Sequence, residues 1–191
     1  MSILIRNARV LTMGASTKAR RGADLKQLHA IDGADVLISG EHIEAVGKSL
    51  DAPESPERRV IDAGGRVLMP AFVDCHTHAC WTGDRLDEWD QKRAGATYLE
   101  ILGKGGGIMS TVRAVREATE EELTISLARR LWHMLREGTT TVEVKSGYGL
   151  DLQSELKMLR AIRAAPVHWP GTVDRTALLG HAMDPERRHF V

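Results

Sequence analysis

Residues 67–78 read V-L-M-P-A-F-V-D-C-H-T-H, an apolar run that ends in two histidines two positions apart. Its second half, residues 72–78, has the composition of a buried strand. Alternate side chains of a regular strand lie on the same face, so Asp74, His76 and His78 are expected to share one face. Two imidazoles on one face can bind the same metal ion, but one core histidine and one surface histidine would produce the same pattern.

The sequence after this stretch alternates between predicted helices and strands. The glycine-rich residues 105–107 lead into a helical pattern, and a further capped helix is followed by a β-branched strand, a helix with an apolar stripe and a third strand, at residues 119–137, 139–145, 152–162 and 172–179. Such alternation is typical of a parallel α/β sheet or barrel. Active sites of these barrels lie at the carboxyl ends of the strands, which is where the two histidines fall.

The first part of the chain, residues 1–66, is predicted to be β-rich. Short apolar or alternating runs are separated by glycines and by a polar loop, and they lie at residues 3–13, 36–39, 42–46 and 60–61. This pattern predicts a small sheet or sandwich, followed by about three βα units in residues 67–191. A complete (β/α)8 barrel needs roughly 250 residues, so the predicted fold is α/β with a partial barrel.

Composition excludes several classes of function. The chain of 191 residues has 26 basic and 26 acidic side chains, and this balance argues against a surface that binds nucleic acid or acidic lipid. The sequence contains no apolar run of membrane-spanning length, and its start lacks the apolar region of a signal peptide. Two cysteines are too few for a disulfide framework, which favours a reducing compartment and a cytoplasmic location.

Several strings resemble known hydrolases. P-A-F-V-D-C-H-T-H, preceded by I-D-A-G-G, resembles the amidohydrolase superfamily, whose metal-dependent enzymes have a (β/α)8 barrel beside a small β-sandwich. The strings T-G-D-R, G-G-G-I-M-S-T-V-R-A-V-R and V-E-V-K-S-G-Y-G-L-D resemble the imidazolonepropionase family more narrowly, at residues 82–85, 105–116 and 142–151. This resemblance covers essentially the whole chain and about the N-terminal half of a family member.

The resemblance implies an activity and a metal. Family members hydrolyse the cyclic amide C–N bond of 4-imidazolone-5-propanoate to N-formimino-L-glutamate, in histidine degradation, with a metal-activated water. By this resemblance His76 and His78 bind one divalent ion, zinc or iron. Asp74 is a candidate to hydrogen-bond an imidazole and fix its tautomer. The family's remaining metal ligands and its acid/base carboxylate come from later strands and are expected beyond residue 191.

The resemblance also implies a set of substrate contacts. Arg85, Tyr148 and His181 would bind the substrate from the loops after successive strands, and Tyr98 is a further pocket candidate. An arginine presents a permanently charged, planar fork to a propanoate carboxylate, and tyrosine and histidine exchange hydrogen bonds with a polar ring. The expected partner is therefore a small molecule.

Three departures from the family pattern leave alternatives open. Ala71 stands where the family usually has glycine, the segment around His181 is one residue shorter than usual, and the later metal ligands are absent. Another amidohydrolase, such as a nucleobase deaminase, and a non-catalytic fragment are the competing interpretations. Exposed strand edges of a partial barrel could also pair copies of the chain into a homo-oligomer.

Overall fold

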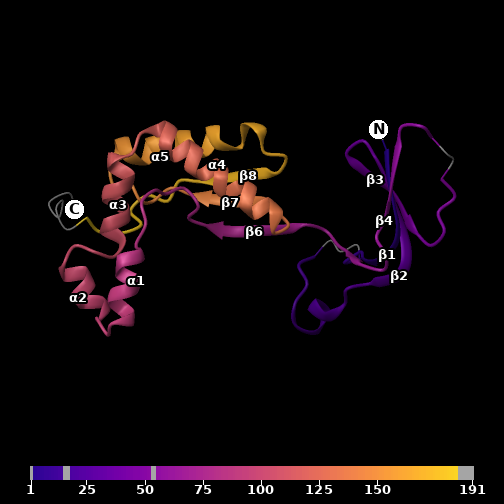
Figure 1. The fold of residues 1–191 in the computed structure, drawn as a ribbon, viewed down its shortest axis with the longest axis horizontal. Helices are drawn as coiled ribbons and strands as arrows, with labels where there is room; N and C mark the ends of the chain where they lie inside the picture. The colour runs from indigo at the N-terminus through magenta and orange to yellow at the C-terminus, as the bar shows by residue number, and fades with distance from the viewer. Residues whose placement is uncertain (1, 15–17, 53–54, 185–191) are drawn as a thin grey trace. The chain divides into compact units, whose positions relative to one another are not determined.

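The computed structural model describes residues 2–14, 18–52 and 55–184 and divides the chain into two compact units. One unit extends to Pro70 and the other begins at Ala71 (Figure 1). The two units have separate cores, so each is described by itself.

The first unit is a five-stranded sheet in which β1 is the central strand. β1 pairs with β2 in antiparallel fashion and with β4 and β5 in parallel, and β3 pairs with β2. The strands are β1 (Ser2–Leu11), β2 (Ala30–Ser39), β3 (His42–Gly47), β4 (Arg58–Asp62) and β5 (Val67–Leu68). β2 begins six residues before the predicted run at residue 36, because its pairing with β1 continues through the polar residues at its start. The core of this first unit contains Ala8, Val10, Ala34 and Val36.

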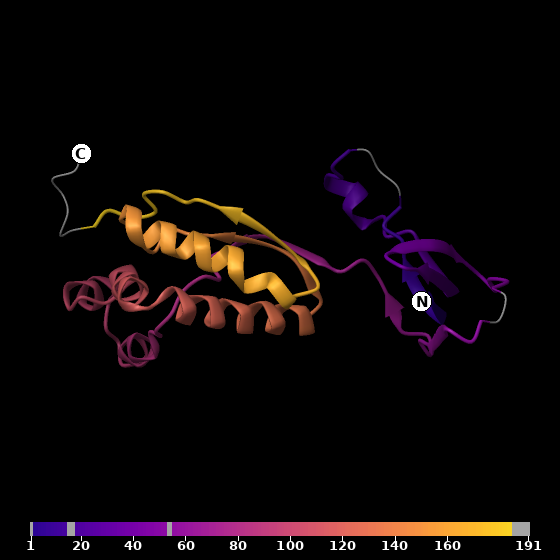
Figure 2. The same ribbon diagram turned by 90° about the horizontal axis from the view of Figure 1, so that it is seen from above.

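The second unit contains a parallel sheet in the order β6-β7-β8. The strands are β6 (Phe72–Thr77), β7 (Thr139–Lys145) and β8 (Thr172–Thr176), and the bounds of β7 are those predicted. The long helices α4 (Glu120–Arg136) and α5 (Leu152–Ala164) run beside the sheet (Figures 1 and 2), and a short 3-10 helix, η2 (Ala165–His168), precedes β8. The strand-helix-strand alternation predicted for this part of the chain is confirmed.

Alternation of side chains along β7 separates an apolar face from a polar one. Val142 and Val144 are fully buried and pack with apolar side chains of both long helices, including Leu127 on α4 and Ile162 on α5. Glu143, between the two valines, projects to the other face, as the period of a strand requires. This second face is therefore the polar one.

Among the described residues, no helix combines the length and the apolar character that crossing a membrane requires.

Three shorter helices gather beyond the carboxyl ends of the strands (Figures 1 and 2). They are α1 (Leu86–Arg93), α2 (Tyr98–Gly103) and α3 (Ile108–Glu117). α3 was predicted by the glycine-rich residues before it, and its amphipathic face buries Met109, Val112 and Val115. The sequence did not predict α1 or α2. α1 buries no apolar side chain, so the periodicity that reveals a surface helix is missing from it.

The start of α4 is fixed by the capping box that the sequence predicted. The Thr119 hydroxyl accepts the Glu122 backbone N–H at 3.1 Å, and the Glu122 carboxylate accepts the Thr119 backbone N–H at 2.8 Å. Replacing Thr119 with alanine is expected to lower the free energy of unfolding by about 1 kcal/mol. Urea denaturation measures the change, and Ser126→Ala in the middle of α4 is the control, expected to stay within about 0.5 kcal/mol. Equal losses in both variants would contradict the capping role.

Candidate functional site

The two histidines of the opening stretch lie together at the carboxyl end of β6. Their ring centroids are 5.8 Å apart, with His76 exposed and His78 partly buried. The register of β6 against β7 shifts between Asp74 and Thr77, so the strand is not regular through the motif. This irregularity inserts an extra residue into β6, as a β-bulge does, and bulges commonly re-aim side chains near functional sites.

His78 is the centre of a cluster of rings from three successive strand ends. Its ring stacks on that of His181, which follows β8, with centroids 4.6 Å apart. Tyr148, in the loop after β7, lies 5.3 Å from His78 and 5.7 Å from His181 between ring centroids. Gly147 allows the close approach of His181, because a Cβ at Gly147 would lie 3.1 Å from the His181 Cβ. The structure therefore brings together four of the residues singled out from the sequence.

The electrostatic surroundings of His78 favour a neutral imidazole. Burial lowers the pKa of His78, and the nearby His181, His76 and Lys145 lower it further. Among the residues that the structure describes, none is a hydrogen-bond partner of the buried Nδ1 atom of His78. A neutral imidazole with an unpartnered nitrogen is the form that binds a metal ion, so this ring fits the metal-binding role expected of it.

Arg85 lies on the wall of a cavity with Tyr148. The cavity has a volume of about 390 Å³, and its lining residues are Trp81, Gly83, Asp84, Arg85, Leu86, Thr111 and Tyr148. The Arg85 guanidinium donates from Nε and Nη2 to the buried Glu88 carboxylate, at 2.9 and 2.6 Å, and these hydrogen bonds raise the pKa of Arg85. Glu88 also accepts the Gly107 backbone N–H at 2.8 Å. This carboxylate therefore holds Arg85 at the cavity wall and connects it to the glycine-rich loop.

The ring contacts of the cluster involve neither Tyr98 nor Asp74 among the described residues. Tyr98 is the first residue of α2 and is 54% exposed, and its hydroxyl lies near Gly107, 3.7 Å from where a Cβ on that glycine would be. The Asp74 carboxylate accepts the backbone N–H of His76 at 3.3 Å, so the hydrogen bond that the structure gives it is with the main chain. Its predicted role as a partner of an imidazole stays a prediction.

An ion pair whose acidic member the sequence analysis did not single out lies beside His78 on the polar face of the sheet. Lys145 pairs with Glu143, and Glu143 also accepts the Thr77 backbone N–H at 3.2 Å. Burial opposes ionisation of Glu143, but hydrogen bonds from Lys145, Thr176 and Thr77 outweigh it and lower the pKa of this carboxyl. The alternation of charged residues with valines in β7 was the available sequence signal. This pair places a positive and a negative charge next to the ring cluster.

The cysteines of this region differ sharply in environment. Cys75 is exposed, whereas Cys80 is fully buried in the core, and burial raises the pKa of the Cys80 thiol to about 12. Because the thiolate is the reactive form, we expect a thiol reagent to modify Cys75 readily in the native chain and Cys80 only after unfolding. Counting reacted thiols with and without urea measures this, and Cys75→Ser serves as the control. Two fast-reacting thiols in the native chain would contradict the buried position of Cys80.

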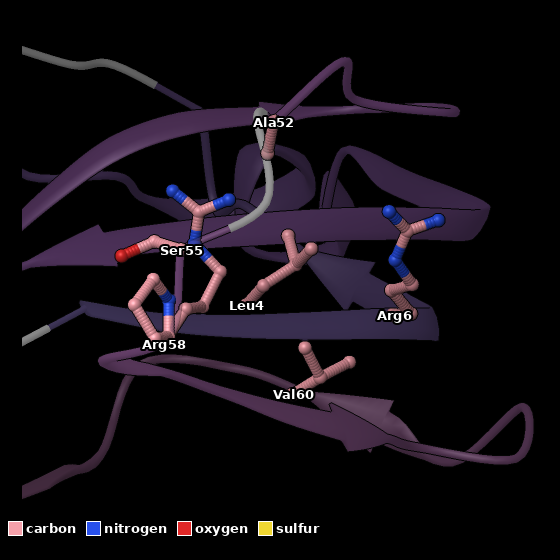
Figure 3. Close-up of a pocket in the computed structure, with 7 residues that line it drawn as sticks. Leu4, Arg6, Ala52, Ser55, Arg58 and Val60 are labelled. Carbon is pink, nitrogen blue, oxygen red and sulfur yellow. The ribbon is translucent and has the colours of Figure 1, made fainter.

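A separate cavity of about 630 Å³ lies in the first unit. Figure 3 shows Leu4 and Val60 between the side chains of Arg6 and Arg58, and the lining is completed by Ala52, Ser55 and Pro56. Arg58 donates from Nε to the Ser2 hydroxyl at 3.2 Å. None of the residues singled out from the sequence lines this cavity, so the candidate site is confined to the second unit.

Comparison with known proteins relates this chain to metabolic hydrolases. The sequence profile of the amidohydrolase family matches residues 59–108, which include His76 and His78. A curated imidazolonepropionase from Rubrobacter xylanophilus is 48% identical over 170 residues, and one from Pseudomonas fluorescens is 49% identical over 156 residues. The chain is similar in sequence to imidazolonepropionases. The family resemblance that the sequence predicted is confirmed.

The similarity to imidazolonepropionases is unequal in its coverage of the two proteins. The Rubrobacter match includes 87% of this chain but 41% of the relative, and the Pseudomonas match includes 82% and 39%. The chain therefore spans about two fifths of the length of the curated imidazolonepropionases that it matches.

Solved structures share the fold of this chain. A triazine hydrolase from Arthobacter aurescens is 21% identical with a TM-score of 0.57, over 92% of this chain and 35% of that protein. A Xaa-Pro dipeptidase with bound methionine is 15% identical with a TM-score of 0.52, over 93% and 33%. These proteins show that the chain has an amidohydrolase-type fold of mixed α and β structure.

Proposed function

We propose that this chain supplies part of the active site of an imidazolonepropionase. The reaction would be hydrolysis of the cyclic amide C–N bond of 4-imidazolone-5-propanoate to N-formimino-L-glutamate. The observation that carries the proposal is the meeting of His76, His78, Tyr148 and His181 at one end of the parallel sheet, in a chain 45–49% identical to curated imidazolonepropionases.

His76 and His78 would hold one divalent ion, zinc or iron, and the unpartnered Nδ1 of His78 fits this role. Bound there, the ion would supply a water of lowered pKa as the nucleophile. A catalytic zinc takes three or more protein ligands, and the described part of the chain contains no group of three or more histidine, cysteine and carboxylate side chains that could hold a metal. Catalysis would therefore need ligands in addition to these two histidines.

The substrate would lie between the ring cluster and Arg85. Nε and Nη2 of Arg85 donate to Glu88, and its Nη1 group would donate to the propanoate carboxylate. Tyr148 lines the same cavity and contacts the ring of His78, so its hydroxyl can hydrogen-bond the imidazolone while Arg85 holds the carboxylate. Tyr98, near Gly107, is proposed to contact the substrate more peripherally.

The finer architecture is part of the same proposal. β6, β7 and β8 would be the first three strands of a (β/α)8 barrel, in residues 67–191, with α4 and α5 on its outside and the polar face of β7 inside. Residues 1–66 would contribute their sheet to a small β-sandwich. The convergence of the candidate residues at the carboxyl ends of the strands supports this, because barrel enzymes place their active sites there.

A chimaera tests the proposed reaction. Residues 1–191 replace the matching segment of the Rubrobacter xylanophilus imidazolonepropionase, and formation of N-formimino-L-glutamate is measured with the purified protein. We expect turnover that is lost in the His76→Ala/His78→Ala chimaera. Deamination of cytosine or guanine in place of ring opening would support a nucleobase deaminase. A folded, metal-loaded chimaera that acts on neither substrate would contradict the proposal.

A further inference from the structure

A buried carboxylate on α5 holds the loop that carries Tyr148. Glu155 is 4% exposed, and its Oε2 accepts the backbone N–H of Gly147 at 2.8 Å. Its Oε1 accepts the N–H groups of Gly149 and Leu150 at 2.8 and 2.9 Å. Tyr148 therefore lies between two residues whose amides bind different oxygens of a single carboxylate.

The backbone of this loop depends on those hydrogen bonds. Gly147 has a φ of +116° and Leu150 a φ of +55°, in a region that a leucine rarely occupies. A Cβ at Gly149 would lie 2.6 Å from the Glu155 backbone nitrogen, so the loop is pressed directly against the start of α5. Strained backbone persists only where the surroundings determine it, and here the carboxylate provides three of the interactions.

The same loop is tied to the segment that carries His181. Arg116 on α3 donates from Nε to the Gly149 carbonyl at 2.8 Å and from Nη2 to the Asp184 carboxylate at 2.7 Å. The buried Ser146 hydroxyl accepts the backbone N–H of Leu178 at 3.2 Å. A displacement of the Tyr148 loop would therefore extend to the neighbouring loop and to the ring that stacks on His78.

We propose that Glu155 is a positioning residue that sets the ring of Tyr148 against His78 and toward the Arg85 cavity. Both of its oxygens are occupied by backbone amides, so it acts through the loop and not on the reacting atoms. The role in substrate binding rests on the proposed function. The control of Tyr148 by Glu155 stands on the hydrogen bonds themselves.

Glu155→Gln is the most selective substitution at this position, because it changes the hydrogen bonding of the side chain and keeps its shape. The glutamine side chain has nearly the shape of glutamate, but one oxygen becomes an NH₂ group that cannot accept an amide N–H. In Glu155→Gln, Gly147 or the pair of Gly149 and Leu150 loses its acceptor inside a buried site. The loop is then expected to leave its position, while the fully buried core of α4 and β7 keeps its packing.

Fluorine NMR of the 191-residue chain tests this directly. The chain has two tyrosines, so 3-fluorotyrosine gives one signal for Tyr148 and one for Tyr98, which serves as an internal reference. In Glu155→Gln the Tyr148 signal is expected to shift and broaden while the Tyr98 signal stays in place. The exposed Glu121→Gln on α4 is the matched control and should leave both signals unchanged. A folded Glu155→Gln chain with the Tyr148 signal of the unsubstituted chain would overturn the proposal.

Two further measurements separate the outcomes. If Glu155→Gln does not fold, amide exchange in the unsubstituted chain decides: slow exchange at Gly147, Gly149 and Leu150 supports the proposal, and unprotected exchange overturns it. The substrate-like probe 3-(imidazol-4-yl)propanoate, added to the zinc-loaded chain, is expected to bind about tenfold more weakly to Glu155→Gln. Failure of this probe to bind the unsubstituted chain would count against the proposed function alone, because the Tyr148 signal reports on Glu155 without a ligand.

Discussion

The double variant His76→Ala/His78→Ala is expected to bind zinc at least about 100-fold more weakly than the unsubstituted chain, because it loses both imidazoles of the proposed site. A competition titration against a chromophoric chelator measures the difference. His133→Ala, which removes an exposed histidine of α4, is the control and should leave the zinc affinity unchanged. A double variant that retains the original affinity would place the metal elsewhere in the chain.

Replacing Leu127 with alanine is expected to lower the free energy of unfolding by about 2–5 kcal/mol. Leu127 is fully buried in the core cluster that also contains Val142 and Met158, so its loss leaves a cavity in that core. Domains are stable by only about 5–15 kcal/mol, and this single change removes a large part of that margin.

Chemical denaturation of both variants measures the effect of Leu127→Ala against Ile125→Ala, two residues away on the same helix. Ile125 is 52% exposed, and its truncation is expected to change the free energy of unfolding by about 0.5 kcal/mol or less. If the two variants lose the same stability, Leu127 is not in the core that the structure describes.

The sequence predicted the elements whose formation depends on local signals. The β-branched run of β7 gave its bounds, and the Thr119 and Glu122 pair gave the start of α4. A comparable local signal precedes α2, since Thr97 and Glu100 also form a capping box. α1 had no such signal, because the residue it buries is the charged Glu88, and the backbone N–H of Gly107 that this carboxylate accepts is brought to it only by the tertiary structure.

The sequence likewise predicted some features of the candidate site and not others. The positions of His78, Tyr148 and His181 after successive strands predicted that they would meet, because parallel strands bring their carboxyl ends to one edge. The stacking of His78 on His181 and the shift of register in β6 could not be predicted, since both depend on how neighbouring strands pair. The role of Glu155 could not be predicted either, because its partners are backbone amides that leave no pattern in the sequence.

X-ray absorption at the zinc edge of the chain loaded with one equivalent of zinc tests the central claim, that His76 and His78 bind one metal ion together. We expect a shell of nitrogen and oxygen at about 2.0–2.1 Å with the outer-shell pattern of two imidazoles, which is lost in His76→Ala/His78→Ala. A shell of sulfur at about 2.3 Å, or a spectrum that the double substitution does not change, would contradict it.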